Sequence, residues 1–89
     1  MELEWDEAKR QRTLRTRGLD FEDLVRFEWR TAIIVFQDRD GEFRKLAYGH
    51  LDGRLMAVGY VIRDGAVRVF SMRKANKREQ KRYAAKTSV

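Results

Sequence analysis

The amino-acid sequence predicts a single α+β domain over residues 1–89, with two N-terminal helices, a four-stranded antiparallel meander sheet and a C-terminal basic helix. Three Asp-Gly pairs at an even twelve-residue spacing are the main reason: Asp40-Gly41, Asp52-Gly53 and Asp64-Gly65. Asp-Gly tolerates the positive φ angles of type I′ turns, so each pair indicates a two-residue hairpin loop. The segments between the pairs are rich in branched and aromatic residues, which favours strands.

Helix-capping residues define the other elements. Asp6 is placed to cap a first helix that runs to about Arg17, and Gly18 suits the left-handed position after its end. Asp20 is placed to cap a second, short helix that ends near residues 27–29. We expect strands at about 30–38, 42–51, 54–63 and 66–73, and a final helix from about Asn76 through Tyr83.

Regular two-residue turns also fix which residues share a face of the sheet, because side chains alternate with a period of two. One face is predicted to be buried under the first two helices; it carries Ile34, Phe36, Phe43, Ala47, Met56, Val58, Tyr60, Ile62, Val67 and Val69. The opposite face mixes apolar, aromatic and cationic groups, which is typical of an interaction surface. It carries Ile33, Val35, Gln37, Arg44, Leu46, Tyr48, His50, Ala57, Gly59, Val61, Arg68, Phe70 and Met72.

Two arginines on this opposite face are predicted to lie close together. Arg44 and Arg68 both lie opposite Val61, one on each neighbouring strand. Their guanidinium groups can therefore converge on one phosphate, provided that no bulge interrupts the strands.

Composition narrows the classes of function. The chain has 89 residues, a net charge of +6, no cysteine and one histidine, His50. This composition excludes a disulfide framework and a thiolate metal site, and we expect neither a metal nor a cofactor. No apolar run approaches the length of a membrane span and no signal peptide is recognisable, so we expect a cytoplasmic protein. The positive charge favours a polyanionic partner, either nucleic acid or an acidic protein segment.

Four short motifs follow one another along most of the chain. In order they comprise Trp5, Asp6 and Lys9; Thr13, Thr16, Arg17, Gly18, Phe21, Glu22 and Asp23; Gly41, Glu42, Arg44 and Gly49; and Arg68, Ser71, Arg73, Lys74, Ala75, Glu79 and Tyr83. Their order and spacing resemble the BrnT family of toxins from type II toxin-antitoxin systems. The second motif is only partly present, because Thr13, Thr16 and Arg17 stand where the family has Asn, Lys and His.

The resemblance implies a RelE-like fold and a metal-independent ribonuclease that cleaves RNA and inhibits translation. Cleavage by attack of the ribose 2′-OH needs a proton acceptor, a proton donor and positive charge around the phosphorane. Arg44, Arg68 and Arg73 are the candidates for that charge, Glu79 for the acceptor, and Tyr83 or Lys74 for the donor or for stacking on a base. Further RNA-binding candidates are Lys74, Lys77, Arg78 and Arg82.

Two of these residues also have structural interpretations. Glu79 lies three residues after Asn76, which is the spacing of a capping box. Tyr83 can pack its ring on the sheet instead of contacting RNA.

The resemblance also implies a cognate, BrnA-like antitoxin with a DNA-binding region, often of ribbon-helix-helix type. We expect it to cover Arg44, Tyr48, Arg68 and Phe70, to form a 2:2 complex, and to provide the only route to DNA. No membrane partner is expected. The alternative is a catalytically degenerate toxin-like module that binds an antitoxin or RNA without cleavage, which the replaced histidine and the apolar content of the opposite face favour.

Overall fold

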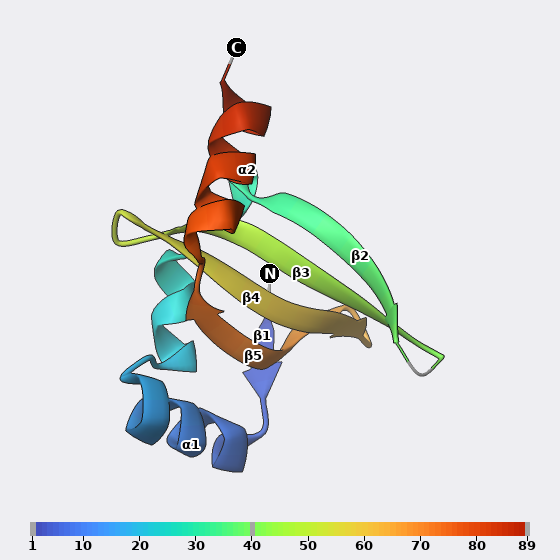
Figure 1. The fold of residues 1–89 in the computed structure, drawn as a ribbon. Coiled ribbons are helices and arrows are strands. Elements are labelled where there is room, and N and C mark those ends of the chain that lie inside the picture. Colours follow the sequence, from blue (N-terminus) through green and yellow to red (C-terminus); the bar gives the residue numbers. More distant parts are fainter. Residues whose placement is uncertain (1, 40, 89) are drawn as a thin grey trace.

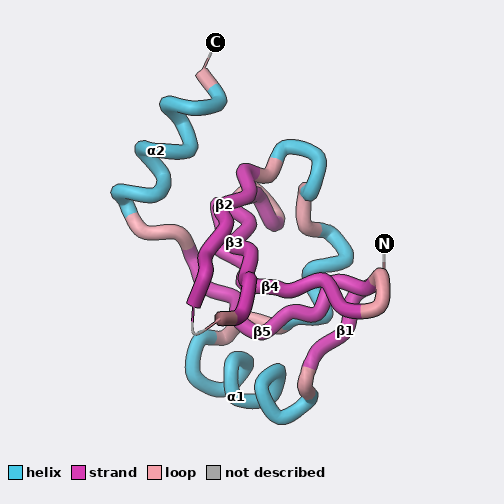
Figure 2. The backbone as a smooth tube through the Cα atoms, turned by 90° about the vertical axis from the view of Figure 1, so that its right-hand side faces the viewer, coloured by secondary structure: helices cyan, strands magenta, loops and turns pink. Residues whose placement is uncertain are grey.

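The computed structural model describes residues 2–39 and 41–88, which fold as a mixed sheet with helices at its margins (Figure 1). The elements in chain order are β1 (Leu3–Trp5), α1 (Glu7–Arg17), the 3₁₀ helices η1 (Phe21–Arg26) and η2 (Trp29–Thr31), β2 (Ile33–Arg39), β3 (Glu42–Leu51), β4 (Arg54–Arg63), β5 (Ala66–Lys74) and α2 (Lys77–Thr87). The α+β class is therefore confirmed. Helices α1 and α2 lie at opposite ends of the molecule (Figures 1 and 2).

The predicted four-stranded antiparallel sheet is wrong in one respect, because the sheet has five strands in the order β1-β5-β4-β3-β2. Strand β1 pairs in parallel with β5, from Leu3 opposite Val67 to Trp5 opposite Val69. Three residues are too few to display a period-two pattern, and a parallel pair has no turn residues to mark it. The partner strand β5 lies more than 60 residues further along the chain, and the hydrogen bonds of β1 depend on it.

The predicted turns and the register of the central hairpin are confirmed. Asp52 and Gly53 have φ angles of 51° and 82°, and Asp64 and Gly65 have 52° and 79°, as type I′ turns require. Leu51 pairs with Arg54 across the first of these turns. The remaining pair includes Asp40, which lies outside the described residues.

The helices differ from the predictions in type and extent. In α1 the Asp6 carboxylate accepts from the backbone N–H groups of the first turn, and Gly18 closes the helix at φ 67°, as predicted. The second predicted helix is instead η1, capped by Asp20. Only six residues separate the Asp20 cap from the extended residue Phe27, and they form a short 3₁₀ helix. Because η2 follows, β2 begins only at Ile33.

The core lies between η1 and one face of the sheet. Phe21 and Leu24 of η1 are fully buried against a cluster from the strands that includes Met56, Val58, Val67, Val69 and Met72. Helix α1 was expected to share this task, but it contributes no buried residue. Most of its side chains are charged or polar, so it has no apolar stripe to bury.

Three residues predicted to be buried are exposed. Phe36, Phe43 and Ile62 keep 59%, 60% and 49% of their surface. They lie on the predicted face but towards the outer ends of their strands, beyond the part that η1 covers. The rings of Phe36 and Phe43 pack on each other instead, with centroids 5.4 Å apart.

A β-bulge in β5 overturns the predicted face of Met72. Gly59 pairs with Ser71 whereas Tyr60 pairs with Val69, so Phe70 is the extra residue. An extra residue reverses the alternation beyond it. Met72 therefore faces the core and is fully buried, and the next residue, Arg73, turns to the opposite face.

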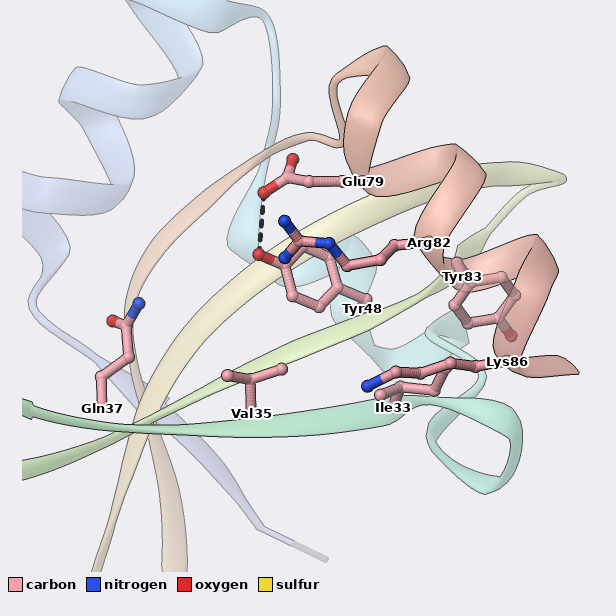
Figure 3. Close-up of a pocket in the computed structure, with 8 residues that line it drawn as sticks. All are labelled: Ile33, Val35, Gln37, Tyr48, Glu79, Arg82, Tyr83 and Lys86. Carbon is pink, nitrogen blue, oxygen red and sulfur yellow. Dashed lines mark hydrogen bonds between the residues drawn. The ribbon is translucent and has the colours of Figure 1, made fainter.

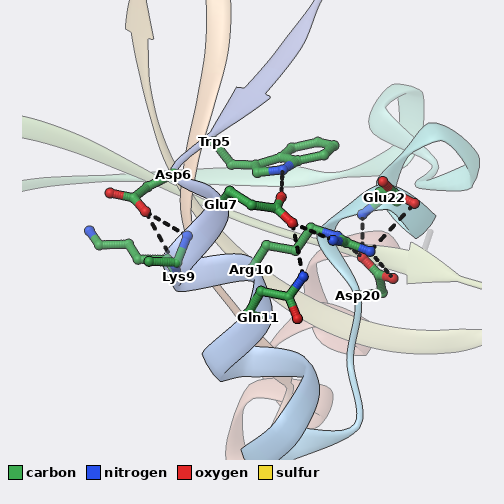
Figure 4. Close-up of polar contacts among 9 residues, drawn as sticks. Trp5, Asp6, Glu7, Lys9, Arg10, Gln11, Asp20 and Glu22 are labelled. Atoms are coloured by element: carbon green, nitrogen blue, oxygen red, sulfur yellow. Dashed lines mark hydrogen bonds and ion pairs between the residues drawn. The ribbon is translucent and has the colours of Figure 1, made fainter.

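Arg10 fixes α1 to η1 (Figure 4). Its Nε donates to Asp20 Oδ1 at 2.8 Å and its Nη1 donates to Glu7 Oε2 at 2.7 Å. The Trp5 ring packs edge-on against Phe21. Among the described residues, no helix has the length and apolar character needed to span a bilayer.

Candidate functional site

The sheet face turned away from η1, here called the open face, carries two rows of side chains that include predicted site residues. Gln37 pairs with Arg44, and Val61 pairs with Arg68. Arg44 lies one residue beyond the Lys45–Tyr60 pair, which places it opposite Val61 and confirms the predicted row.

The second row lies four residues further along β3, or about 13 Å away. Tyr48 pairs with Ile33 on one side and with Ala57 on the other, and Ala57 pairs in turn with Arg73. The bulge at Phe70 brings Arg73 into this row. The two rows therefore lie at different positions along the sheet.

A hollow of about 190 Å³ at the first row, here called the cationic hollow, gathers positive charge from four elements, α1, β3, β4 and β5. Lys9, Val61, Arg63 and Phe70 line it together with the two arginines of the row. Lys9 extends away from the Arg10 ion pairs that fix its helix (Figure 4).

A cation–π contact, an ion pair and a glycine define the walls of the cationic hollow. The Arg44 guanidinium carbon lies 4.9 Å from the centroid of the Phe70 ring. Arg68 Nη1 is 3.6 Å from Glu4 Oε1 on β1. A Cβ atom on Gly59 would lie 2.7 and 2.8 Å from atoms of the Phe70 ring, so only glycine lets that ring lie across β4.

At the second row, Glu79 is held by three partners. Arg73 donates to it twice, from Nη1 to Oε1 at 2.7 Å and from Nη2 to Oε2 at 2.9 Å. The Tyr48 hydroxyl donates to Oε2 at 2.7 Å. The backbone N–H of Asn76 donates to Oε1 while Asn76 Oδ1 accepts from the Glu79 N–H, so the predicted capping box is confirmed.

These contacts set the protonation of the cluster. Hydrogen bonding to Arg73 lowers the pKa of Glu79 to about 2. Burial, with the neighbouring Glu79 charge, raises the pKa of Tyr48. Hydrogen bonding to Glu79 raises the pKa of Arg73. A carboxylate with so low a pKa is a poor proton acceptor at neutral pH, so we interpret Glu79 as the residue that positions Arg73 and Tyr48.

Beside this cluster a groove of about 280 Å³ separates β2 from α2 (Figure 3). Ile33, Val35 and Gln37 of β2 and Tyr48 of β3 line one side of it, and Glu79, Arg82, Tyr83 and Lys86 of α2 line the other. The Tyr83 hydroxyl donates to the carbonyl oxygen of Thr31 at 2.8 Å, and its ring meets the His50 ring edge-on.

The structure thus separates the residues that were predicted as one catalytic set. Arg44 and Arg68 lie in the cationic hollow, Arg73 and Glu79 form the ion pair, and Tyr83 lines the groove. Of the RNA-binding candidates, Arg82 reaches the groove, Lys74 lines another hollow beside His50, and Lys77 and Arg78 are exposed on α2. The residues expected to meet an antitoxin, Arg44, Tyr48, Arg68 and Phe70, all lie on the open face or at its bulge.

Sequence reasoning did not select Lys9 or Gln37 as site residues. Lys9 occupies a motif position, but only the folded chain brings α1 next to β5. Arg17 donates from Nη1 to the carbonyl oxygen of Met72 at 2.8 Å and so connects α1 to β5.

Comparisons with known proteins agree on one family. A family model described as the ribonuclease toxin BrnT of type II toxin-antitoxin systems matches residues 5–79. The crystal structure of the Brucella abortus ribonuclease toxin BrnT is similar to this chain with a TM-score of 0.72 and 35% sequence identity, over 86% of this chain and 99% of that one. A search of curated proteins found no match.

Proposed function

We propose that this chain, which belongs to the BrnT family of ribonuclease toxins from type II toxin-antitoxin systems, cleaves RNA at the cationic hollow. One observation carries the location. Lys9, Arg44 and Arg68 come from α1, β3 and β5 and surround a single hollow with Phe70 as its aromatic wall. Convergent cations beside an aromatic ring suit a phosphate and an adjoining base.

In the proposed reaction the ribose 2′-oxygen attacks the adjacent phosphorus and the bond from phosphorus to the 5′-oxygen breaks. Water accepts the proton of the 2′-OH and supplies one to the departing 5′-oxygen, which gives a 2′,3′-cyclic phosphate and a free 5′-hydroxyl. Arg44, Arg68 and Lys9 stabilise the extra negative charge of the phosphorane, because fixed cations act most strongly where charge develops. The reaction as proposed uses no metal ion.

The second row binds the neighbouring part of the RNA in this proposal. The guanidinium of Arg73, which Glu79 orients, binds a phosphate there. Tyr83 and Arg82 of α2 contact the same RNA strand. Lys74, Lys77 and Arg78 add sequence-independent attraction for phosphates.

Neutralisation by an antitoxin is the other part of the proposed function. A toxin that cleaves RNA and inhibits translation needs a partner that covers its cations. The open face offers Phe70 and Tyr48 as apolar contacts beside Arg44 and Arg68, so it suits a segment with apolar anchors and carboxylates. We propose a cognate antitoxin with a ribbon-helix-helix DNA-binding region, a 2:2 complex, and DNA contact only through that antitoxin.

An RNA cleavage assay with EDTA present tests the catalytic proposal. Arg68→Ala and Lys9→Ala should each lower the cleavage rate by about 100-fold, the loss typical of removing one charge-stabilising group. Arg54→Ala is the matched control, because Arg54 is exposed at the opposite end of the sheet beside Asp52-Gly53. Circular dichroism establishes that each variant is folded. Equal rates in the parent and in folded Arg68→Ala would remove Arg68 from the site.

A second candidate function is a binding module that has lost catalysis. The observation that favours it is Arg17, whose guanidinium is engaged in a structural bond to Met72 at a position where the family has histidine. Purified protein that binds its antitoxin tightly but leaves RNA intact would select this function.

A further inference from the structure

Helix α2 stands off the sheet and presents an unusual face to it. Glu79, Arg82, Tyr83 and Lys86 follow the spacing i, i+3, i+4 and i+7, which places them on one side of the helix. In a packed helix this stripe is apolar, but here it consists of charged and aromatic residues, and α2 has no buried residue. The helix therefore rises away from the sheet (Figure 1) and leaves the groove of about 280 Å³ between itself and β2.

Polar contacts on two successive turns hold this groove open. Glu79 in the first turn of α2 accepts from Tyr48 and Arg73. One turn later the Tyr83 hydroxyl donates to the carbonyl oxygen of Thr31, just before β2 begins. The groove is therefore formed before any ligand arrives.

The lining of the groove combines an apolar floor with a cationic rim. Ile33 and Val35 form the floor, and Tyr48 and Tyr83 contribute aromatic rings (Figure 3). Arg82 and Lys86 add positive charge along α2. The volume lies just below the range of pockets for drug-sized ligands, so the groove suits one flat ring system better than a helix.

We infer that this groove is a base-binding subsite that holds one unpaired nucleotide of the RNA substrate; the inference rests on the proposed function. Gln37 makes the connection to the cleavage site, since it lines the groove and is also the register partner of Arg44 in the cationic hollow. An RNA strand with one phosphate bound at Arg44 can therefore place a neighbouring nucleotide in the groove. Bases in a duplex are stacked and paired, so only single-stranded RNA or a loop can enter.

Gln37 is also placed to discriminate between bases. Its amide can donate and accept hydrogen bonds, which matches the polar edge of a base. The apolar floor and the tyrosine rings accept any base by stacking. We therefore assign base preference to Gln37 and affinity to the rest of the groove.

A pair of matched variants tests the subsite. Val35→Glu places a negative charge in the groove, and Val25→Glu places the same charge on η1, behind the other face of the sheet, where Val25 is 75% exposed. The probes are fluorescein-labelled oligo(A) and oligo(U) with methylated 2′-hydroxyls, which cannot be cleaved, and a duplex of the two. Binding to the full chain is measured by fluorescence anisotropy, and circular dichroism checks folding.

Val35→Glu should weaken single-strand binding roughly tenfold relative to Val25→Glu, the loss of about one stacked base, while both variants bind the duplex alike. Gln37→Ala should reduce the difference between oligo(A) and oligo(U). Equal single-strand affinities of the two glutamate variants, with a parent that binds and cleaves RNA, would overturn the subsite alone. Loss of antitoxin binding without loss of RNA binding in Val35→Glu would assign the groove to the antitoxin. A parent without RNA affinity would overturn the proposed function as well.

Discussion

Glu79 and Arg73 form a two-pronged ion pair, with N···O distances of 2.7 and 2.9 Å, between the first turn of α2 and the end of β5. The Glu79 side chain is only 12% exposed in this position. Most helices are attached to their domain by apolar packing, but α2 buries no residue of its own. The ion pair and the Tyr48 hydroxyl therefore attach its first turn to the sheet.

Stability should therefore depend on Glu79 in a pH-dependent way. Its folded pKa of about 2 lies below the ordinary value of 4.5, so its charge stabilises the fold above pH 4.5 and this contribution is lost as the pH falls towards 2. We expect Glu79→Gln to lower the free energy of unfolding by about 1–2 kcal/mol at pH 7, since its partner Arg73 is partly solvated.

Urea unfolding of the parent and of Glu79→Gln at pH 7, 4.5 and 3 measures this contribution. The difference between the two proteins should shrink as the pH is lowered. Glu28→Gln, a change at an exposed position, is the control and should be neutral throughout. A difference that stays constant from pH 7 to pH 3 would mean that the charge of Glu79 contributes nothing.

Gly59 should be coupled energetically to Phe70. Gly59→Ala forces the added methyl group against the ring, and we expect a loss of about 1–3 kcal/mol in unfolding free energy. In a Phe70→Ala background the same change should cost less, because the ring is gone and the Ser71 hydroxyl can rotate. Chemical denaturation of the four proteins in this double-mutant cycle gives the coupling, and equal costs in both backgrounds would contradict it.

Antitoxin affinity should depend on Phe70 and Arg44. Phe70→Ala or Arg44→Glu should weaken the complex tenfold or more, because the aromatic ring and the guanidinium stack on each other at the centre of the proposed interface. Phe43→Ala is the control, since Phe43 is 60% exposed but lies on the other face of the sheet. Isothermal titration calorimetry with the cognate antitoxin measures the change.

Unaltered affinity in the Phe70 and Arg44 variants would place the antitoxin elsewhere. Salt provides a further distinction between the two partners. RNA binding should weaken steeply with rising salt, whereas the half-apolar antitoxin interface should respond less.

Local turn chemistry predicted the cationic row well, because the row lies on the hairpin side of the bulge. Val61 and Arg68 pair close to the Asp64-Gly65 turn, where the count from the turn is still regular. The bulge at Phe70 comes after them, so it changed the face of Met72 and Arg73 but left Arg68 in place. A β-bulge is defined by the pairing with the neighbouring strand, so the alternation of residues along one strand does not reveal it.

Burial was predicted less well than register, for a different reason. The alternation of side chains tells which face Phe36 and Phe43 occupy, but not how far the covering helix extends along it. The position of Lys9 in the cationic hollow could not be predicted either, because it depends on the long-range contact between α1 and β5. The capping box of Asn76 and Glu79 depended on four consecutive residues and was predicted correctly.

The parallel pairing of β1 with β5 has a consequence for the order in which this protein can fold while it is being synthesised. Leu3 pairs with Val67, so β1 can join the sheet only when nearly the whole sequence has been translated. Lys9, which follows β1, meets Arg68 at the same moment. Lys9 therefore cannot join Arg68 before β5 has been translated, and the cationic hollow is complete only after β5 has emerged.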